Sequence, residues 1–127
     1  MTGRTALDSN SIIADLRDGD VPTLPSGPDA IIPLPVLGEL FAGAYSSKQR
    51  DANVTSIDKF IATRTVLAPD AATARDYGIL RSRFVTKLSI AKVNDLWIAA
   101  LCLQHNLPLL TNDRGFDSIA ELTVIHW

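Results

Sequence analysis

Residues 4–19 read RTALDSNSIIADLRDG, and this stretch carries the structural unit from which the fold follows. Residues 4–7 are typical of a short strand, and the pattern after them predicts a helix that ends at Gly19. Asp8 lies between the two. A strand that leads directly into a helix is typical of an α/β fold with a parallel sheet.

The same alternation of short apolar strands and helices continues along the chain. Further strands are predicted at residues 30–33, 65–68, 107–111 and 122–126. Further helices are predicted at residues 35–45, around 54–61, at 71–84 and from Asn94 to about His105. The sequence has no evident internal repeat or low-complexity tract. We therefore expect a single domain over residues 1–127, with an α/β fold around a central, mostly parallel five-stranded sheet.

The composition is that of a folded globular domain: 127 residues, of which 46% are hydrophobic and 20% are charged. The formal net charge of −2 argues against a polybasic protein that binds nucleic acid by bulk electrostatics. It does not exclude a nuclease, since a local basic rim can surround an acidic metal site.

Cys102 is the only cysteine, which excludes an internal disulfide framework and a cysteine-rich zinc site. It lies in an apolar helical segment, where we expect a buried, inert thiol. No signal-peptide pattern opens the chain, and no apolar run reaches the roughly 20 residues needed to span a bilayer. We expect a cytoplasmic protein without a membrane segment.

Four acidic residues stand out because they adjoin apolar segments: Asp8, Glu39, Asp95 and Asp113. Asp8 and Asp113 each follow a predicted strand, and Asp95 is expected to open a helix. Glu39 lies about one turn into its helix and is long enough to reach back. Ligands of open α/β sheets bind at the carboxyl ends of the strands, so we expect the four side chains to converge there.

Such a cluster has a chemical consequence. Two carboxylates about 4 Å apart repel each other by roughly 4 kcal/mol at an effective dielectric constant near 20, unless a cation neutralises them. Ligands that are all oxygen favour a hard ion, Mg²⁺ or Mn²⁺. A metal ion of this kind activates water and clamps phosphoryl oxygens, so the pattern indicates metal-assisted phosphodiester hydrolysis.

Each acid also has an ordinary structural explanation. Asp8 and Asp95 are suited to cap the helices that follow them, and Asp113 to an Asx-turn. Glu39 is explained equally well as a solvated helix residue. The shared location of all four favours a common site over four separate roles. Asp117 is expected at the surface or in a cap.

Four short motifs carry a family resemblance. In chain order they are LDSNSII at residues 7–13, GEL at 38–40 followed by Gly43, NDLWIAA at 94–100, and TND at 111–113 with Phe116 after it. In order and spacing they resemble the PIN-domain ribonucleases, and most closely the VapC toxins of prokaryotic toxin–antitoxin pairs. The resemblance spans essentially the whole chain and implies a three-layer α/β/α fold.

The resemblance also implies roles for the acids. Asp8, Asp95 and Asp113 would ligate Mg²⁺ or Mn²⁺, with Glu39 binding directly or through water. Two asparagines near these acids would support the site without binding the metal. Asn10 would orient a carboxylate, and Asn112 would add a polar contact. One departure is Val36, at a position where the family often has Ser or Thr.

The substrate implied by the resemblance is single-stranded or looped RNA, cut by a metal-activated water that leaves a 3′-hydroxyl and a 5′-phosphate. A VapB-type antitoxin and a second copy of the chain are the implied protein partners. Basic residues near the acids are the candidates for contacts to RNA phosphates: Arg114 first, then Lys92 and Lys87, and then Arg81 and Arg83. His105 and His126 do not adjoin the acids, and Trp97 is expected in the core.

Three other functions compete with this interpretation. A PIN-like module that binds RNA or protein without cutting would not need four acids. A structure-specific DNA nuclease would use the same chemistry. An aspartate-phosphorylated domain fits less well, because phosphatases of that type want an Asp where Asn10 stands, and receivers want an acidic pair after the first strand.

Overall fold

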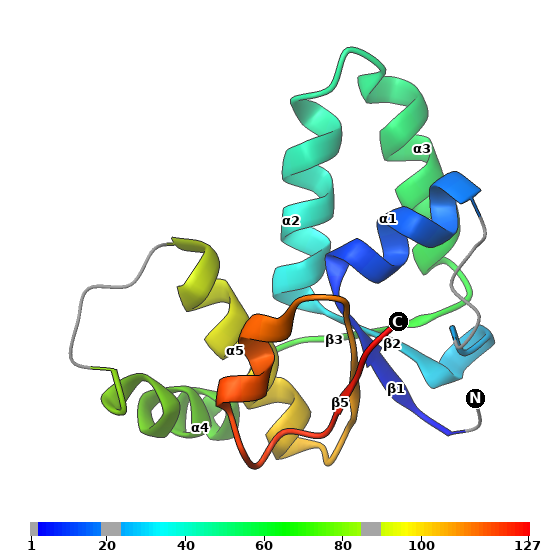
Figure 1. Ribbon diagram of the computed structural model, residues 1–127. Helices are drawn as coiled ribbons and strands as arrows, with labels where there is room; N and C mark the ends of the chain where they lie inside the picture. Colours follow the sequence, from blue (N-terminus) through cyan, green and yellow to red (C-terminus); the bar gives the residue numbers. More distant parts are fainter. Residues whose placement is uncertain (1–2, 19–23, 85–89) are drawn as a thin grey trace.

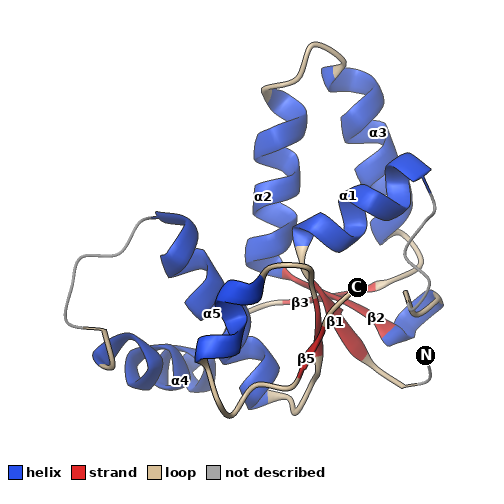
Figure 2. Cartoon of the chain, viewed as in Figure 1, coloured by secondary structure: helices blue, strands red, loops and turns tan. Residues whose placement is uncertain are grey.

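The computed structural model describes residues 3–18, 24–84 and 90–127. In this part of the chain, one sheet is formed by β1 (Thr5–Leu7), β2 (Ala30–Pro33), β3 (Thr65–Leu67), β4 (Leu109–Leu110) and β5 (Val124–Ile125). All neighbouring strands pair in parallel, in the order β3-β2-β1-β4-β5. The predicted five-stranded sheet and the three-layer α/β/α arrangement are confirmed (Figures 1 and 2).

Five α-helices connect the described strands: α1 (Ser9–Asp18), α2 (Leu34–Tyr45), α3 (Arg50–Ile61), α4 (Ala71–Ser82) and α5 (Ile90–Gln104). The helices α2 and α3 form a hairpin that stands away from the sheet, whereas α4 packs against α5 on the other side (Figure 1). Two short 3₁₀ helices complete the fold, η1 (Gly27–Asp29) and η2 (Arg114–Ser118).

The predicted elements are present, but one boundary differs in a way that matters. Helix α5 begins at Ile90, more than a turn before the predicted start at Asn94, so Asp95 lies inside the helix and does not cap it. The polar pair Asn94-Asp95 resembles a cap in the sequence. Helix-compatible residues such as Lys92 extend the helix upstream of that pair.

Strands β4 and β5 are each three residues shorter than predicted, and β1 and β3 are each one residue shorter. Only Leu109 and Leu110 of the predicted strand at 107–111 pair in the sheet, and only Val124 and Ile125 of the one at 122–126. Before β4 the chain is still leaving α5, because the N–H of Leu107 donates to the carbonyl of Cys102. Asn106 makes this turn with φ of 53°, a conformation that Asn tolerates well after a helix.

The core lies between the sheet and the apolar faces of the helices. Strand residues such as Leu7, Ile31 and Leu109 are fully buried, as expected for a parallel sheet covered on both faces. Cys102 is 1% exposed, which confirms the expected buried thiol. Trp97 stacks on Tyr77 with ring centroids 4.1 Å apart, so its ring is used in packing between α4 and α5.

The strand order places one crevice at the centre of the sheet. Strand β1 has β2 on one side and β4 on the other, and the strand order reverses at this point. Leu7 lies opposite Leu110, so the next residues, Asp8 and Thr111, leave the sheet side by side. Ligands of open α/β sheets bind where the order reverses.

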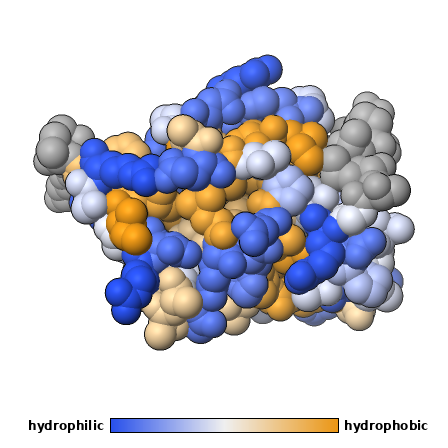
Figure 3. Space-filling view, turned by 90° about the horizontal axis from the view of Figure 1, so that it is seen from below, coloured by the Kyte–Doolittle hydropathy of each residue, from blue (hydrophilic) through white to orange (hydrophobic). Residues whose placement is uncertain are grey.

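The molecule also carries apolar surface. Seen from below, apolar side chains reach the surface in the middle of that face, with hydrophilic ones around them (Figure 3). Val66 in β3 and Ile79 in α4 are among the large apolar residues that are exposed, at 38% and 52%. Of the helices described here, none combines the length and apolar character needed to cross a membrane.

Candidate metal centre

Asp8 is the most enclosed of the four acids, with 5% of its surface exposed. Its Oδ1 accepts a hydrogen bond from the N–H of Ser9 at 2.9 Å. Its Oδ2 accepts from Nδ2 of Asn10 at 3.1 Å and from the hydroxyl of Thr111 at 2.8 Å. Burial raises the pKa of Asp8 above its ordinary value, although these hydrogen bonds act in the opposite direction. The carboxylate is therefore held in one orientation at an electrostatic cost.

Thr111 links the ends of the two central strands. Its side chain is fully buried, and its Oγ1 donates to Asp8 while accepting from Asn10 Nδ2 at 3.2 Å and from the N–H of Asp113 at 3.0 Å. One hydroxyl proton and two lone pairs account for all three contacts. In the prediction from sequence, Thr111 ends a strand and opens the TND motif but has no role of its own. The signal for such a role is a hydroxyl residue directly after an apolar strand and two positions before an acid.

Glu39 reaches the same region from α2. Burial raises the pKa of Glu39, and the negative charge of Asp8 raises it further. Among the described residues, its Oε1 is a buried oxygen that has no hydrogen-bond partner. A buried carboxylate oxygen without a partner is costly, which argues against the alternative of a solvated helix residue.

Asp95 shows the strongest perturbation. Burial, followed by the charges of Asp8 and Asp113, raises the pKa of Asp95 to about 7, and Glu39 adds to the effect. Lys92 acts in the opposite direction, with its Nζ 4.0 Å from Oδ2 of Asp95. A carboxyl group with this pKa is held in an environment that disfavours its charge.

Asp113 takes the role of an Asx-type cap as well as lying near the other acids. Its Oδ1 accepts from the N–H of Gly115 at 2.8 Å, at the start of η2. The turn expected as an ordinary explanation is therefore present. It does not exclude a role in metal binding, because the contact engages one of the two carboxylate oxygens.

The charges of the four acids thus influence one another. Asp8 and Asp113 follow β1 and β4, and Glu39 and Asp95 lie in α2 and α5. Among the described residues, no three His, Cys, Asp or Glu side chains converge closely enough to form a closed metal-binding group. The four carboxylates fit a hard cation, because all their ligand atoms are oxygens. The raised pKa of Asp95 and the buried Oε1 of Glu39, unpaired in the described part of the chain, also favour a positive charge beside them.

The two asparagines lie where the sequence placed them but differ in their contacts. Asn10 bridges Asp8 and Thr111 through Nδ2. Asn112 contributes its backbone N–H, which donates to Oδ1 of Asn10 at 3.3 Å, while its side chain is exposed. A second polar layer lies behind Asn10. The indole N–H of Trp127 donates to Oγ of Ser11 at 2.9 Å, and that hydroxyl donates to the carbonyl of Leu110.

The basic candidates are not equally close to the acids. Lys92 lies beside Asp95, as described above. Arg114 is exposed, with its Nη1 4.0 Å from Oδ2 of Asp117. Arg83 forms an ion pair with Glu121. Lys87 lies outside the described residues.

Asp117 has a surface role, as expected. Its Oδ1 lies 2.8 Å from Nε2 of His126, and its side chain is 47% exposed. The pair packs the end of the chain against η2, and neither residue enters the contacts of Asp8, Glu39, Asp95 or Asp113 described above.

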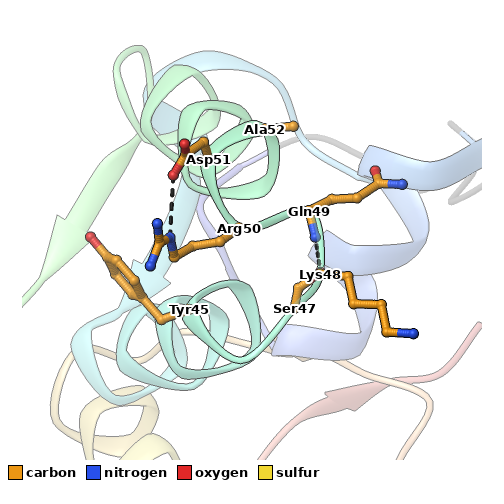
Figure 4. A pocket seen from close by; sticks show the side chains of 7 residues that line it. All are labelled: Tyr45, Ser47, Lys48, Gln49, Arg50, Asp51 and Ala52. Atoms are coloured by element: carbon orange, nitrogen blue, oxygen red, sulfur yellow. Dashed lines mark hydrogen bonds and ion pairs between the residues drawn. The ribbon is translucent and has the colours of Figure 1, made fainter.

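Another hollow of the described surface lies away from the acids. It occupies about 450 Å³ at the turn between α2 and α3 and is lined by Tyr45 and residues 47–52. Figure 4 shows its single carboxylate, Asp51, paired with Arg50 at 3.2 Å, while Lys48 points away from this pair. The hollow is open and its lining includes no residue of the acidic cluster, so we assign the candidate site to the cluster.

The chain is similar to known proteins in sequence and in fold. The PIN domain family matches residues 6–122. The chain is 32% identical over 93 residues to the ribonuclease VapC2 of Rickettsia felis, covering 72% of this chain and 69% of that one.

Solved structures are similar over nearly the whole fold. The VapBC2 structure of Rickettsia felis bound to a promoter DNA fragment has a TM-score of 0.78 at 24% identity, covering 97% of this chain and 98% of that one. The DNA-bound VapBC of Salmonella typhimurium has a TM-score of 0.82 at 23% identity, covering 99% of both chains.

Proposed function

Because this chain belongs to the PIN-domain family, among its VapC ribonucleases, we propose that it is a Mg²⁺- or Mn²⁺-dependent endoribonuclease and the toxin of a type II toxin–antitoxin pair. The observation that carries the metal-dependent chemistry is the electrostatic coupling of four carboxylates at one edge of the sheet. The coupling supports a shared cation and phosphodiester hydrolysis as the reaction.

In this proposal Asp8, Asp95 and Asp113 hold the cation, and Glu39 binds it directly or through water. When bound there, a hard divalent cation lowers the pKa of a coordinated water and neutralises charge on phosphate oxygens. Asp8 is kept in place by its three donors, so it needs little reorganisation. Attack in line on the phosphorus leaves a 3′-hydroxyl and a 5′-phosphate on the RNA.

Lys92 and Arg114 border the acids and are proposed to contact phosphates of the substrate. Lys92 is 53% exposed and Arg114 is 77% exposed, so both ammonium and guanidinium groups can reach a bound strand. A net charge of −2 makes such local contacts necessary, because the whole molecule does not attract a polyanion.

The proposed antitoxin is of the VapB type, since the solved structures similar to this chain are VapBC complexes. A groove of about 310 Å³ between α1, α2 and α3 suits an apolar segment of such a partner. Ile13 and Leu16 line it and are 44% and 40% exposed. Glu39 lines it too, so an occupant would lie over the acidic site and block it.

A homodimer and a cytoplasmic location complete the proposal. The apolar side chains exposed on one face of the molecule (Figure 3) support self-association, because exposed apolar patches commonly mark protein contacts. Sedimentation of the purified chain with and without antitoxin would give the stoichiometry, and a concentration-independent monomer would contradict the dimer.

The decisive experiment is cleavage of a mixed-sequence RNA with Mg²⁺, with Mn²⁺ and with EDTA. We expect cleavage with either metal, none with EDTA, and a loss of at least about a hundredfold for Asp8→Asn and Asp95→Asn. Asp51→Asn is the matched control, since that carboxylate is 94% exposed and remote from the cluster. Full activity in the Asp8 and Asp95 variants would contradict the assigned site.

The same assay separates the competing functions. A silent binding module would retain the RNA without producing fragments at any metal concentration. A DNA nuclease would cut a matched DNA strand faster than the RNA. Either result would overturn the proposed activity.

A further inference from the structure

Beside the acidic cluster lies a small apolar pocket, here named the side pocket. It has a volume of about 150 Å³, and its apolar lining comes from Phe84, Leu96, Phe116 and Ile119. Lys92 and Asp95 are its polar lining from α5. Figure 1 shows the segment of residues 114–118, in orange, lying against α5, and the pocket is lined from both of these elements.

The side pocket adjoins the proposed reaction centre through a shared residue. Asp95 lines the pocket and also belongs to the acidic cluster, because burial and then the charges of Asp8 and Asp113 raise its pKa. A strand whose phosphate lies at the acids therefore has its neighbouring sugar and base within reach of the pocket. Nothing in the proposed hydrolysis uses Phe84, Phe116 or Ile119, so the pocket calls for a separate explanation.

Gly115 lines the side pocket together with Lys92. A Cβ at this position would lie 2.5 Å from Nζ of Lys92, so any other residue here would displace the ammonium group. The absence of a side chain keeps Lys92 next to Asp95 and over the pocket. An ammonium group beside an apolar cavity matches the phosphate and the base of one nucleotide.

The volume restricts the occupant. A cavity of about 150 Å³, lined in part by apolar side chains, has room for a ring of the size of benzene. Single-stranded RNA offers such rings, because its bases are unstacked and accessible and stack readily on aromatic side chains. Phe84 is only partly buried and belongs to the lining, which makes it the aromatic surface available for that contact.

We propose that the side pocket receives one unstacked base of the RNA next to the cleaved phosphate, and that its size favours a single-ring pyrimidine. This inference rests on the proposed ribonuclease function and adds a determinant of cleavage specificity to it. The apolar lining residues then determine specificity and take no part in the hydrolysis itself: Phe84, Leu96, Phe116 and Ile119.

The test uses RNA oligonucleotides that differ at one position. The cleavage site is first mapped on a mixed-sequence RNA by the masses of the products. The nucleotide on each side of the cut is then replaced in turn by a pyrimidine, a purine or an abasic residue. For the wild-type chain we expect kcat/KM to fall about tenfold at one of the two positions when the base is removed, as for the loss of one stacked base.

Variants of the lining residues test whether the side pocket causes the dependence of kcat/KM on the flanking base. Phe84→Ala should lower kcat/KM about tenfold on the intact RNA and cause no further loss on the abasic RNA. Ser118→Leu, at an exposed residue of the lining, should fill the pocket and abolish the preference for pyrimidine without unfolding the chain. Phe41→Ala is the matched control, because Phe41 is equally partly buried but lies in α2, outside the lining.

The outcomes separate this inference from the function on which it rests. No cleavage of RNA by the wild-type chain would overturn both. Cleavage that is equally fast with and without the flanking bases would overturn the side pocket alone. Loss of antitoxin affinity in Phe84→Ala with unchanged base dependence would assign the pocket to the protein partner and equally overturn the inference.

Discussion

The hydroxyl of Thr111 donates a 2.8 Å hydrogen bond to Oδ2 of Asp8, between residues 103 positions apart in the sequence. The two residues follow β4 and β1, the strands on either side of the point where the strand order reverses. The same hydroxyl accepts from the N–H of Asp113. One buried hydroxyl therefore sets the relative positions of two of the four acids.

Thr111→Val tests this link while keeping the shape of the side chain. We expect the variant to lose about 1–3 kcal/mol of unfolding free energy, because buried partners are left unpaired, and to bind Mg²⁺ more weakly. The measurements are urea unfolding and a metal titration. Thr65→Val is the matched control, since its hydroxyl makes a 3.0 Å bond to the carbonyl of Pro28 at an exposed site. Equal losses in both variants would contradict the role of Thr111.

Asp95 predicts an unusual dependence of stability on pH. Its folded-state pKa of about 7 lies above the ordinary 3.8, so between these values the folded chain binds a proton that the unfolded chain lacks. Stability of the metal-free protein should therefore fall as pH rises from 4 through 7. Asp95→Asn should remove this loss and be more stable than wild type at pH 8, by at least about 1 kcal/mol.

Urea unfolding in EDTA at pH 5 and pH 8 measures the effect of Asp95→Asn. Mg²⁺ should restore much of the wild-type stability at pH 8 and have a smaller effect on the variant, which has lost one negative charge. A difference between the two proteins that does not change with pH would contradict a raised pKa of Asp95 in the folded chain.

Substitution of Asp70 should lower the stability of the protein without affecting RNA cleavage. It caps α4 in a reciprocal arrangement with Thr73, and the hydrogen bond from the backbone of Thr73 is the main cause that lowers the pKa of Asp70. Its stabilising contribution should be present above pH 3.8 and vanish as pH falls through the lowered pKa. Asp70→Ala should lower the Tm and leave RNA cleavage unchanged, whereas Asp58→Ala in α3 should change neither.

Cys102 should be inert in the folded protein. It is 1% exposed, and burial raises the pKa of its thiol to about 12, so the reactive thiolate is scarce. A thiol reagent should modify it only at the rate of unfolding, and fully in denaturant. Fast labelling in native buffer would contradict the packing of α5 described here.

Sequence reasoning identified the strands and helices well because each is marked by its own apolar pattern and its own turn residues. It misplaced the start of α5, because Asn94 and Asp95 have the chemistry of a cap and only their environment reveals another use. It also overlooked Thr111 and the indole contact of Trp127 with Ser11, at 2.9 Å. The sequence does not reveal which distant group a hydroxyl or an indole N–H will bind by a hydrogen bond.

Local apolar patterns in the sequence are enough to predict the alternation of strands and helices, the parallel sheet and the four acids that adjoin its carboxyl edge. The strand order and the contacts that result from it follow from the folding of the whole chain. Folding placed Asp8 beside Thr111, buried Asp95 deeply enough to raise its pKa to about 7, and left an apolar pocket next to it. These properties depend on burial and on charges from distant segments, which exist only once the chain has folded.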